Sequence, residues 1–281
     1  RGFLAGVDMD MMGNAFPYHL ANLAREGLVE EAQIDGAVRR VLRLKFALGL
    51  FEQPYTDPTL AMQVQLTDEH RALALEVAQK SMVLLKNEGH VLPLGANVKT
   101  LALIGPLADD HHNPLGCWHG RGRDADVESV LDGLRVVLPE ETILLHVPGC
   151  AIEGDAAAYA DADFDAAVSA ALAADVAVLV LGETEMQSGE AHSRAHLGLP
   201  GRQQELLEAV AATGKPVVVV LMAGRPLVIP WMVEHVPAIL MAWHGGIRSG
   251  QAIADILFGA VNPSGRLVVS FPRSEGQIPV Y

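Results

Sequence analysis

Cysteine is scarce in this sequence, since Cys117 and Cys150 are the only two among 281 residues. Two cysteines are too few for a disulfide-based scaffold, and their spacing does not show whether they pair. Basic residues are in the minority, with 20 Lys and Arg against 34 Asp and Glu, which gives a formal net charge of −14. A uniformly acidic chain is repelled by phosphate backbones, so we do not expect nucleic acid as a partner.

Long apolar runs and a leader sequence are also missing. No run approaches the ~20 apolar residues needed to cross a bilayer, and the longest, 176–182 and 216–224, have the length of strands. The first residue is Arg1, and the segment that follows does not read as a secretory signal. We therefore expect a piece of a longer chain, with any targeting segment upstream and the compartment undecided. Because 50% of the residues are hydrophobic and 19% are charged, we expect a sizeable packed core.

Several common catalytic motifs are absent. There is no G-x-x-x-x-G-K-[ST], and the glycines in "GRGRDAD" and "HGGIRSG" do not fit G-x-G-x-x-G directly after a strand. There is no G-x-S-x-G to indicate a nucleophilic serine. Histidines and aspartates gather at 109–112, and His192 and His196 are four apart, but there is no H-E-x-x-H and the nearby Gly and Pro indicate loops. We expect neither a metal nor a cofactor.

The first part of the chain reads as helical. Apolar residues recur at helical spacing within 1–50, and Gly49 can end the last helix in a left-handed conformation. Two prolines and two acidic residues in 51–60 indicate a linker. Thr67 is a good N-cap for a second helix that extends to about Gln79.

Strands and helices alternate over the rest of the chain. After a short strand at 81–87, the apolar runs predicted as strands are 99–105, 142–147, 176–182, 216–222 and 238–243. The helical patterns between them are 127–137, 164–173, 201–212 and 248–258. Alternation of this kind, with nearly continuous apolar strands, predicts an α/β fold with a mostly parallel sheet in a three-layer α/β/α sandwich.

The loops that follow the predicted strands carry the polar residues of interest. In such sheets, ligands bind at the carboxyl ends of the strands. Glu183, Glu185 and Glu190 gather in one of these loops, and Trp118 lies in another. A carboxyl group can protonate a leaving oxygen and a Trp face can stack on a sugar ring, so glycoside hydrolysis is one chemistry these residues support. On composition alone, solvated glutamates without a catalytic role remain the alternative.

Five stretches, in order along the chain, resemble glycoside hydrolase family 3, the β-glucosidase and β-xylosidase family. They are 5–11 ("AGVDMDM"), 34–52, 74–94, 189–210 ("GEAHSRAHLGLPGRQQELLEAV") and 250–281. The likeness is greatest to the bacterial periplasmic β-glucosidases of that family. It implies that 1–54 is the C-terminal remnant of a (β/α)8 barrel, that 55–66 is a linker, and that 67–281 is the family's α/β sandwich.

The resemblance implies a retaining β-glucosidase that acts without a cofactor on a β-linked glucoside or short oligosaccharide. Its nucleophile is an aspartate of the barrel in a Ser-Asp-Trp context, and no such segment occurs in this sequence. We therefore expect the nucleophile, and the barrel segment that carries it, upstream of Arg1. The family also implies a periplasmic or secreted location. Specificity for β-xylosides remains an alternative, as do a sandwich that only binds a sugar or a partner, and a purely structural domain.

The resemblance places the acid/base at Glu190, with Glu185 as the runner-up. The alternative for Glu190 is a salt bridge to Arg194. Trp118 corresponds to an aromatic position that borders the sugar site, with simple packing under the long loop as its alternative. His192 and Arg194 are assigned to substrate binding through orientation of the loop.

Other residues receive structural interpretations. We expect Glu183 to mark the end of its strand and Asp8 to fix the backbone of a turn. We expect Trp243 in the core. For Met9, Met11 and Met12 we expect core packing, with a place at the mouth of the implied barrel as the alternative.

Overall fold

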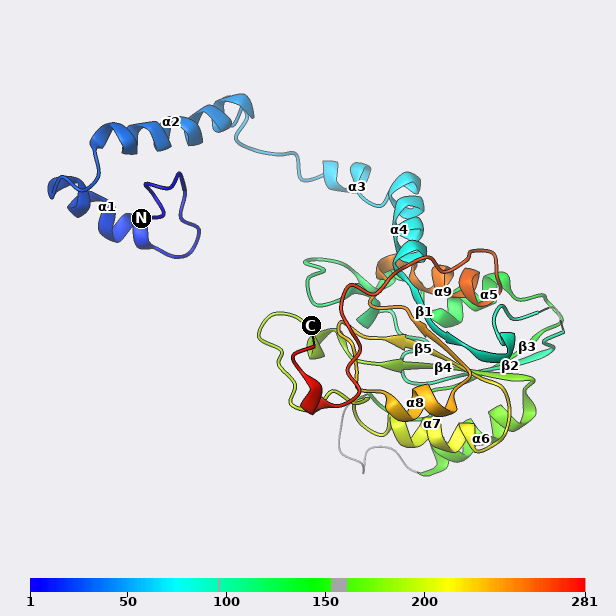
Figure 1. The fold of residues 1–281 in the computed structure, drawn as a ribbon. Coiled ribbons are helices and arrows are strands. Elements are labelled where there is room, and N and C mark those ends of the chain that lie inside the picture. Colours follow the sequence, from blue (N-terminus) through cyan, green and yellow to red (C-terminus); the bar gives the residue numbers. More distant parts are fainter. Residues whose placement is uncertain (96, 153–160, 281) are drawn as a thin grey trace. The chain divides into compact units, whose positions relative to one another are not determined.

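The chain divides into two compact units, Arg1–Gln65 and Leu66–Tyr281 (Figure 1). The structure, a computed structural model, describes residues 1–95, 97–152 and 161–280. The first unit holds the helices α1 (Ala15–Arg25), α2 (Glu31–Ala47) and α3 (Leu60–Val64). As predicted, α2 ends at a left-handed glycine, because Gly49 has φ 66°.

Many large apolar side chains of the first unit are exposed. Met9, Met11 and Met12 are 66%, 81% and 87% exposed, so the expectation that they pack in a core is wrong for this chain. Leu44 and Phe46 of α2 are also about as exposed, at 62% and 60%. An apolar surface of this kind is typical of a segment that lacks the elements it packs against.

The turn before α1 is fixed by Asp10 and not, as we expected, by Asp8. The Asp10 carboxylate accepts hydrogen bonds from the backbone N–H groups of Gly13, at 3.1 Å, and Ala15, at 2.6 Å. Asp8 instead forms a two-bond ion pair with Arg40, with both N–O distances 2.7 Å. An N–H at a helix start lacks a partner within the helix, which explains why the acidic residue closest to α1 takes this place.

The second unit is built on one sheet of six strands in the order β1-β6-β5-β4-β2-β3. The strands are β1 (Val83–Asn87), β2 (Thr100–Ile104), β3 (Ile143–Val147), β4 (Val176–Gly182), β5 (Val217–Met222) and β6 (Ala238–Met241). All neighbours are parallel except β1, which pairs antiparallel with β6. Every predicted strand is present, and each lies within two residues of its predicted bounds.

Helices cover both faces of this sheet, which confirms the three-layer sandwich (Figure 1). One face carries α4 (Asp68–Ser81), α5 (Val130–Val137) and α9 (Ser249–Leu257), and the other carries α6 (Asp161–Ala173), α7 (Gln203–Ala211) and α8 (Pro230–His235). The sequence patterns predicted all of these helices except α8. That helix has only six residues and begins at a proline, so it carries too short a pattern for periodicity to detect.

The strands alternate their side chains between two cores. Along β4, Val178 and Val180 pack on the α5–α9 side, whereas Leu179 and Leu181 pack on the α6–α7 side. All residues of β4 and β5 are buried, as a strand covered on both faces requires. The Thr67 side chain caps α4 as predicted, since it accepts a hydrogen bond from the His70 N–H at 3.3 Å.

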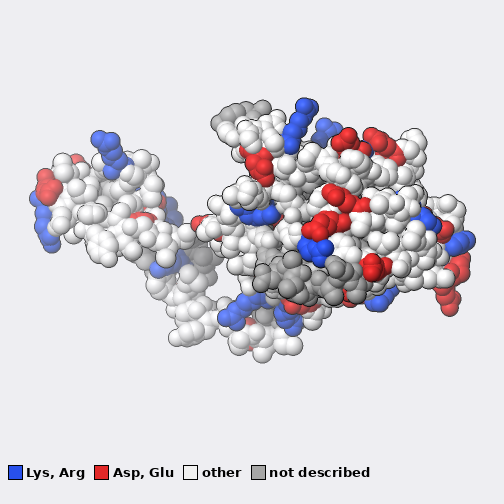
Figure 2. All heavy atoms as spheres, turned by 90° about the horizontal axis from the view of Figure 1, so that it is seen from below, with Lys and Arg blue, Asp and Glu red and all other residues white. Residues whose placement is uncertain are grey.

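The surface carries charged side chains of both signs. On the face that Figure 2 shows, Lys and Arg side chains lie interspersed with Asp and Glu side chains. None of the helices in the described part of the chain has both the length and the apolar character that crossing a bilayer requires.

Candidate functional site

The strand order creates a switch point between β2 and β4. The chain leaves β2 toward β3 on one side, and it leaves β4 toward β5 and β6 on the other. The loops after β2 and β4 therefore diverge, and such a point is where open α/β sheets bind ligands. Trp118 lies in the β2–α5 loop (residues 105–129), and Glu190 lies in the β4–α7 loop (residues 183–202). The sheet thus brings two sequence-predicted site residues to the same edge.

Glu190 occupies the tip of a tight turn. The His192 N–H donates to the Gly189 carbonyl oxygen at 3.2 Å, which closes the turn around Glu190 and Ala191. Gly189 has φ 104° and Ala191 has φ 65°. A left-handed conformation at an alanine costs about 1–2 kcal/mol, so this backbone is held in place by its surroundings. We call residues 187–192 the Glu190 turn.

The Glu190 side chain is exposed, and within the described residues its carboxylate makes no hydrogen bond or ion pair. The alternative of a salt bridge to Arg194 is therefore not what the structure contains. Arg194 instead binds Glu183, and it also donates to the Gly198 carbonyl oxygen at 3.1 Å. The carboxylate at the tip of the turn is left facing solvent.

Glu183 marks the end of β4, as expected, but it is also the centre of a buried ionic cluster. Its side chain is fully buried, and one carboxylate oxygen accepts from Arg194 and lies 3.3 Å from Arg225 Nε. Burial raises the pKa of the Glu183 carboxyl group, whereas the hydrogen bond from Arg194 and the charge of Arg225 oppose that rise. The two guanidinium groups are the partners that a buried carboxylate needs.

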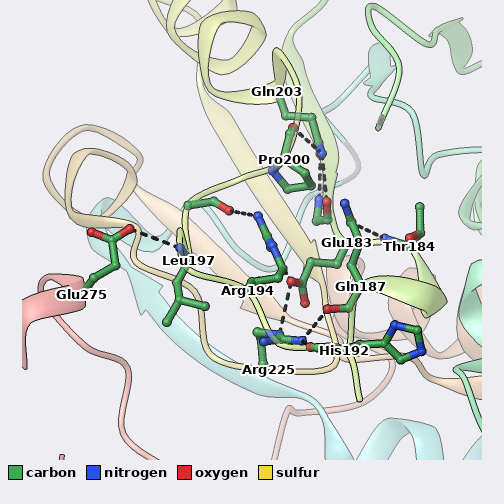
Figure 3. Close-up of polar contacts among 12 residues, drawn as sticks. Glu183, Thr184, Gln187, His192, Arg194, Leu197, Pro200, Gln203, Arg225 and Glu275 are labelled. Carbon is green, nitrogen blue, oxygen red and sulfur yellow. Dashed lines mark hydrogen bonds and ion pairs between the residues drawn. The ribbon is translucent and has the colours of Figure 1, made fainter. Parts of the chain in front are cut away.

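Arg225 connects this cluster to the Glu190 turn (Figure 3). Its Nη2 group donates to the carbonyl oxygen of His192 at 2.7 Å and to that of Gln187. Arg225 lies in the β5–α8 loop (residues 223–229), three residues beyond the end of β5, with Gly224 before it. The sequence analysis assigned no role to this arginine. A charged residue so close to a fully buried strand is the signal that could have found it.

The far end of the β4–α7 loop is held by Gln203. This side chain is fully buried, donates to the carbonyl oxygens of Gly182, at 2.8 Å, and Pro200, at 3.0 Å, and accepts from the Gly182 N–H at 2.8 Å. Figure 3 shows it beside the end of β4. Both ends of the loop are thus fixed to the sheet by buried polar side chains, and sequence reasoning did not identify Gln203.

Trp118 lies next to the Glu190 turn. A Cβ atom added to Gly189 would lie 2.4 Å from Cys117 Sγ and 3.8 Å from Trp118 Nε1, so the two loops touch at this glycine. The Trp118 side chain is 76% exposed, so it does not pack beneath the loop. An exposed indole beside an exposed carboxylate offers a flat surface and a proton donor to one ligand.

Glu185, the runner-up, has a different environment. It is 7% exposed, and its N–H donates to Asn113 Oδ1 at 2.8 Å. Its carboxylate lies 3.4 Å from His112 Nε2. A hydrogen bond with Asp124 raises the pKa of His112, and Glu185 adds to that rise. Through Asn113 and His112, Glu185 thus connects the β4–α7 loop to the β2–α5 loop.

The β6–α9 loop (residues 242–248) closes the remaining side. Burial lowers the pKa of His244, and a Cβ atom on Gly116 would lie 3.6 Å from its Nδ1 atom. We expected Trp243 in the core. Its side chain is partly buried and packs against the core on the α6–α7 side of the sheet, and its indole N–H donates to the Ser81 carbonyl oxygen at 3.1 Å.

One group of side chains in the described residues has the spacing of metal ligands. The His111 Nε2 atom lies 3.6 Å from carboxylate oxygens of both Asp109 and Asp132. However, Ser129 donates to Asp109 at 2.8 Å through its hydroxyl and to Asp132 at 3.2 Å through its backbone, so both oxygens already have partners. His192 and His196, four apart, lie in a loop and not on one helix face.

The family model for the glycosyl hydrolase family 3 C-terminal domain matches residues 82–281. The chain belongs to glycosyl hydrolase family 3. Among its curated relatives in the family, a β-xylosidase of Formosa agariphila is 41% identical over 99% of this chain and 40% of its own length. A periplasmic β-glucosidase of Salmonella typhimurium is 40% identical over 99% of this chain and 39% of its own length.

A solved structure of the same family has the same fold. A mutant β-glucosidase from Listeria innocua, in complex with laminaribiose, is 40% identical with a TM-score of 0.87, over 99% of this chain and 37% of that one. The chain therefore spans about 40% of the length of the family 3 relatives it matches. The family and the sandwich fold inferred from the sequence motifs are both confirmed.

Proposed function

We propose that this chain supplies the acid/base half of a retaining β-glucosidase, with Glu190 as the acid/base. The observation that carries the proposal is the exposed Glu190 carboxylate, which has no partner among the residues that the structure describes. It lies at the tip of a fixed turn, at the switch point of the sheet and beside the exposed Trp118. The named activities of the β-glucosidase and β-xylosidase relatives support the reaction class.

The reaction needs two carboxyl groups about 5–5.5 Å apart. In the complete enzyme, an aspartate outside this chain attacks the anomeric carbon, and the protonated Glu190 gives its proton to the leaving oxygen. The same Glu190, now a carboxylate, then takes a proton from the water that releases the sugar. An acid/base must face both the leaving group and water, and the exposure of Glu190 supports that requirement.

The neighbouring residues have separate roles in this proposal. Trp118 stacks on the sugar of the leaving group through its exposed ring. Arg194 and His192 act on the substrate indirectly, because Arg194 binds Glu183 and the His192 carbonyl oxygen binds Arg225. Glu185 is the weaker candidate for the acid/base, since it is buried between two loops.

The substrate we propose is a β-linked glucoside or a short β-linked oligosaccharide. The partner we propose for the chain is the barrel segment of a longer protein. The periplasmic β-glucosidase among the relatives supports a periplasmic or secreted location. Glucosides and xylosides differ by one hydroxymethyl group, and the relatives include both activities. We propose no role for nucleic acid, in line with the net charge of −14.

The test is Glu190→Ala in the complete enzyme. We expect kcat/KM on cellobiose to fall roughly 10²–10⁴-fold, the usual contribution of a general acid. Added azide should restore part of the turnover of an activated aryl glucoside, because azide needs no base to attack the glycosyl-enzyme. The matched control is Glu141→Ala, which removes an exposed carboxylate before β3, at the opposite edge of the parallel sheet. Normal turnover of cellobiose by Glu190→Ala would refute the assignment.

A further inference from the structure

We propose that Arg225 is a positioning residue for the acid/base, and that it sets the place of the Glu190 carboxyl group by holding both ends of the Glu190 turn. The inference rests on the proposed function, because it gives Arg225 a role in that reaction. Arg225 does not contact the Glu190 side chain. It acts through the backbone on either side of it.

The contacts enclose the turn. One nitrogen of Arg225 donates to the carbonyl oxygen of Gln187, before Glu190, and to that of His192, after it. A single planar group therefore joins two points of the backbone that are five residues apart. Because the Glu190 side chain has no other partner among the described residues, the position of its carboxyl group depends on this backbone.

The guanidinium group is itself anchored. Its Nε atom lies 3.3 Å from Oε1 of Glu183, whose backbone N–H continues the sheet by donating to the Met222 carbonyl oxygen at 2.8 Å. The Arg225 side chain is 21% exposed and the Glu183 side chain is fully buried. The Arg225 side chain is thus anchored at the ends of β4 and β5, two strands whose residues are all buried.

A second contact brings the β5–α8 loop against the same turn. A Cβ atom on Gly224 would lie 2.0 Å from Ser188 Oγ, so the Ser188 side chain occupies the space that a side chain at position 224 would fill. Ser188 is buried, at 4% exposure, although it lies only two residues from the exposed Glu190. The turn therefore packs on the β5–α8 loop at Ser188 and is bound to it by Arg225 at both of its ends.

Geometry of this kind has a kinetic signature. A displacement of about 1 Å in a reacting group can cost roughly 100-fold in rate. In a retaining enzyme kcat/KM reports the formation of the glycosyl-enzyme, and Glu190 takes part in that step only by giving its proton to the leaving oxygen. Its later role as the base that activates water does not enter kcat/KM. 2,4-Dinitrophenolate leaves its glucoside without being protonated. The alcohol of an alkyl glucoside and the second glucose of cellobiose must be protonated to leave. Loss of a positioning residue should therefore lower the rate selectively for poor leaving groups.

The experiment compares kcat/KM of the complete enzyme across aryl glucosides of decreasing leaving-group ability and on cellobiose. For Arg225→Met we expect a loss of roughly 10–100-fold on cellobiose and of less than about 3-fold on the dinitrophenyl glucoside. Arg225→Lys keeps a positive charge, but one ammonium nitrogen cannot take the place of Nε beside Glu183 and also donate to the two carbonyl oxygens that Nη2 reaches. The selectivity of this variant should therefore lie between that of Arg225→Met and that of the wild type. The ratio of the two rates does not depend on how much of a variant is folded.

Two further variants separate the possible failures. Arg248→Met removes a similarly buried arginine, whose partner is Glu128, and any loss should be equal for all leaving groups. Glu190→Ala should show a steeper dependence on the leaving group than any arginine variant. Equal losses across leaving groups for Arg225→Met, with Glu190→Ala still selective, would overturn the positioning role alone. A flat dependence for Glu190→Ala would overturn the proposed function itself.

Discussion

Arg194→Met tests whether the buried Glu183 carboxylate depends on its arginine partners. The Arg194 side chain is 19% exposed and that of Glu183 is fully buried, so the substitution leaves a buried charge with one partner fewer. Removing one partner of a buried pair costs about 3–5 kcal/mol. Because Arg225 Nε remains 3.3 Å from the same carboxylate, we expect the lower value. A loss of about 3 kcal/mol corresponds to a decrease in Tm of roughly 6–12 °C for a domain of this size.

The pH dependence of the loss provides a second test. Burial already raises the pKa of Glu183 above its ordinary value of 4.5, and removal of Arg194 should raise that pKa further. A carboxyl group with a raised pKa in the folded state contributes stability that is fully present below the unfolded pKa. That contribution is lost as the pH rises through the folded pKa. The difference in stability between the variant and the wild type should therefore be smaller at pH 5 than at pH 8.

The assay is urea unfolding of the chain, followed by circular dichroism at both pH values. The control is Arg248→Met, whose partner Glu128 has a side chain that is 31% exposed. A more exposed pair contributes up to about 1 kcal/mol, so this variant should lose less. If Arg194→Met lost under about 1 kcal/mol at pH 8, or lost the same amount at both pH values, the ionic cluster would not be what holds the base of the loop.

Two other predictions concern the sandwich. Gly133→Ala should lower the free energy of unfolding by about 1–3 kcal/mol, because its Cβ would lie 2.2 Å from the Gly250 carbonyl oxygen where α5 meets α9. Gly198→Ala, with nothing within 4 Å of its Cβ, is the matched control, and equal melting temperatures for the two would disprove this packing argument. Asp175→Asn should flatten the loss of stability on acidification, because the hydrogen bond from the Thr100 N–H lowers the pKa of Asp175. The wild-type carboxylate stabilises the fold above the ordinary pKa of 3.8 and loses this effect as the pH falls further. If the urea midpoints of the wild type and of Asp175→Asn fell by the same amount from pH 6 to pH 3, this prediction would be wrong.

The sheet could be predicted because its signal is local and strong. The run 176–182 is apolar at nearly every position, and only a strand covered on both faces needs such a run. The helices with a long enough apolar pattern were found for the same reason. The six-residue α8 was missed because it is too short to show a period and begins at a proline.

The site was predicted in part. The position of Glu190 in a loop after a buried strand could be inferred from sequence, since parallel strands place such loops at one edge. Arg225 and Gln203 could not, because their partners are backbone carbonyl oxygens, and carbonyl oxygens leave no trace in the residue types. The alternative that paired Arg194 with Glu190 is wrong for a different reason, because sequence alone does not show which of several nearby carboxylates an arginine binds. The true partner of Arg194, Glu183, is eleven residues away in sequence.

The capping of the β4–α7 loop at both ends has a consequence for how sequences of this kind can vary. Between the Glu190 turn and Gln203, the chain passes through Ala195 and His196, which are both exposed. Extra residues added at that point would lengthen the outer part of the loop and leave the Glu190 turn where it is. In the function we propose, insertions here would change which leaving groups reach the site without moving the carboxyl group that gives them its proton.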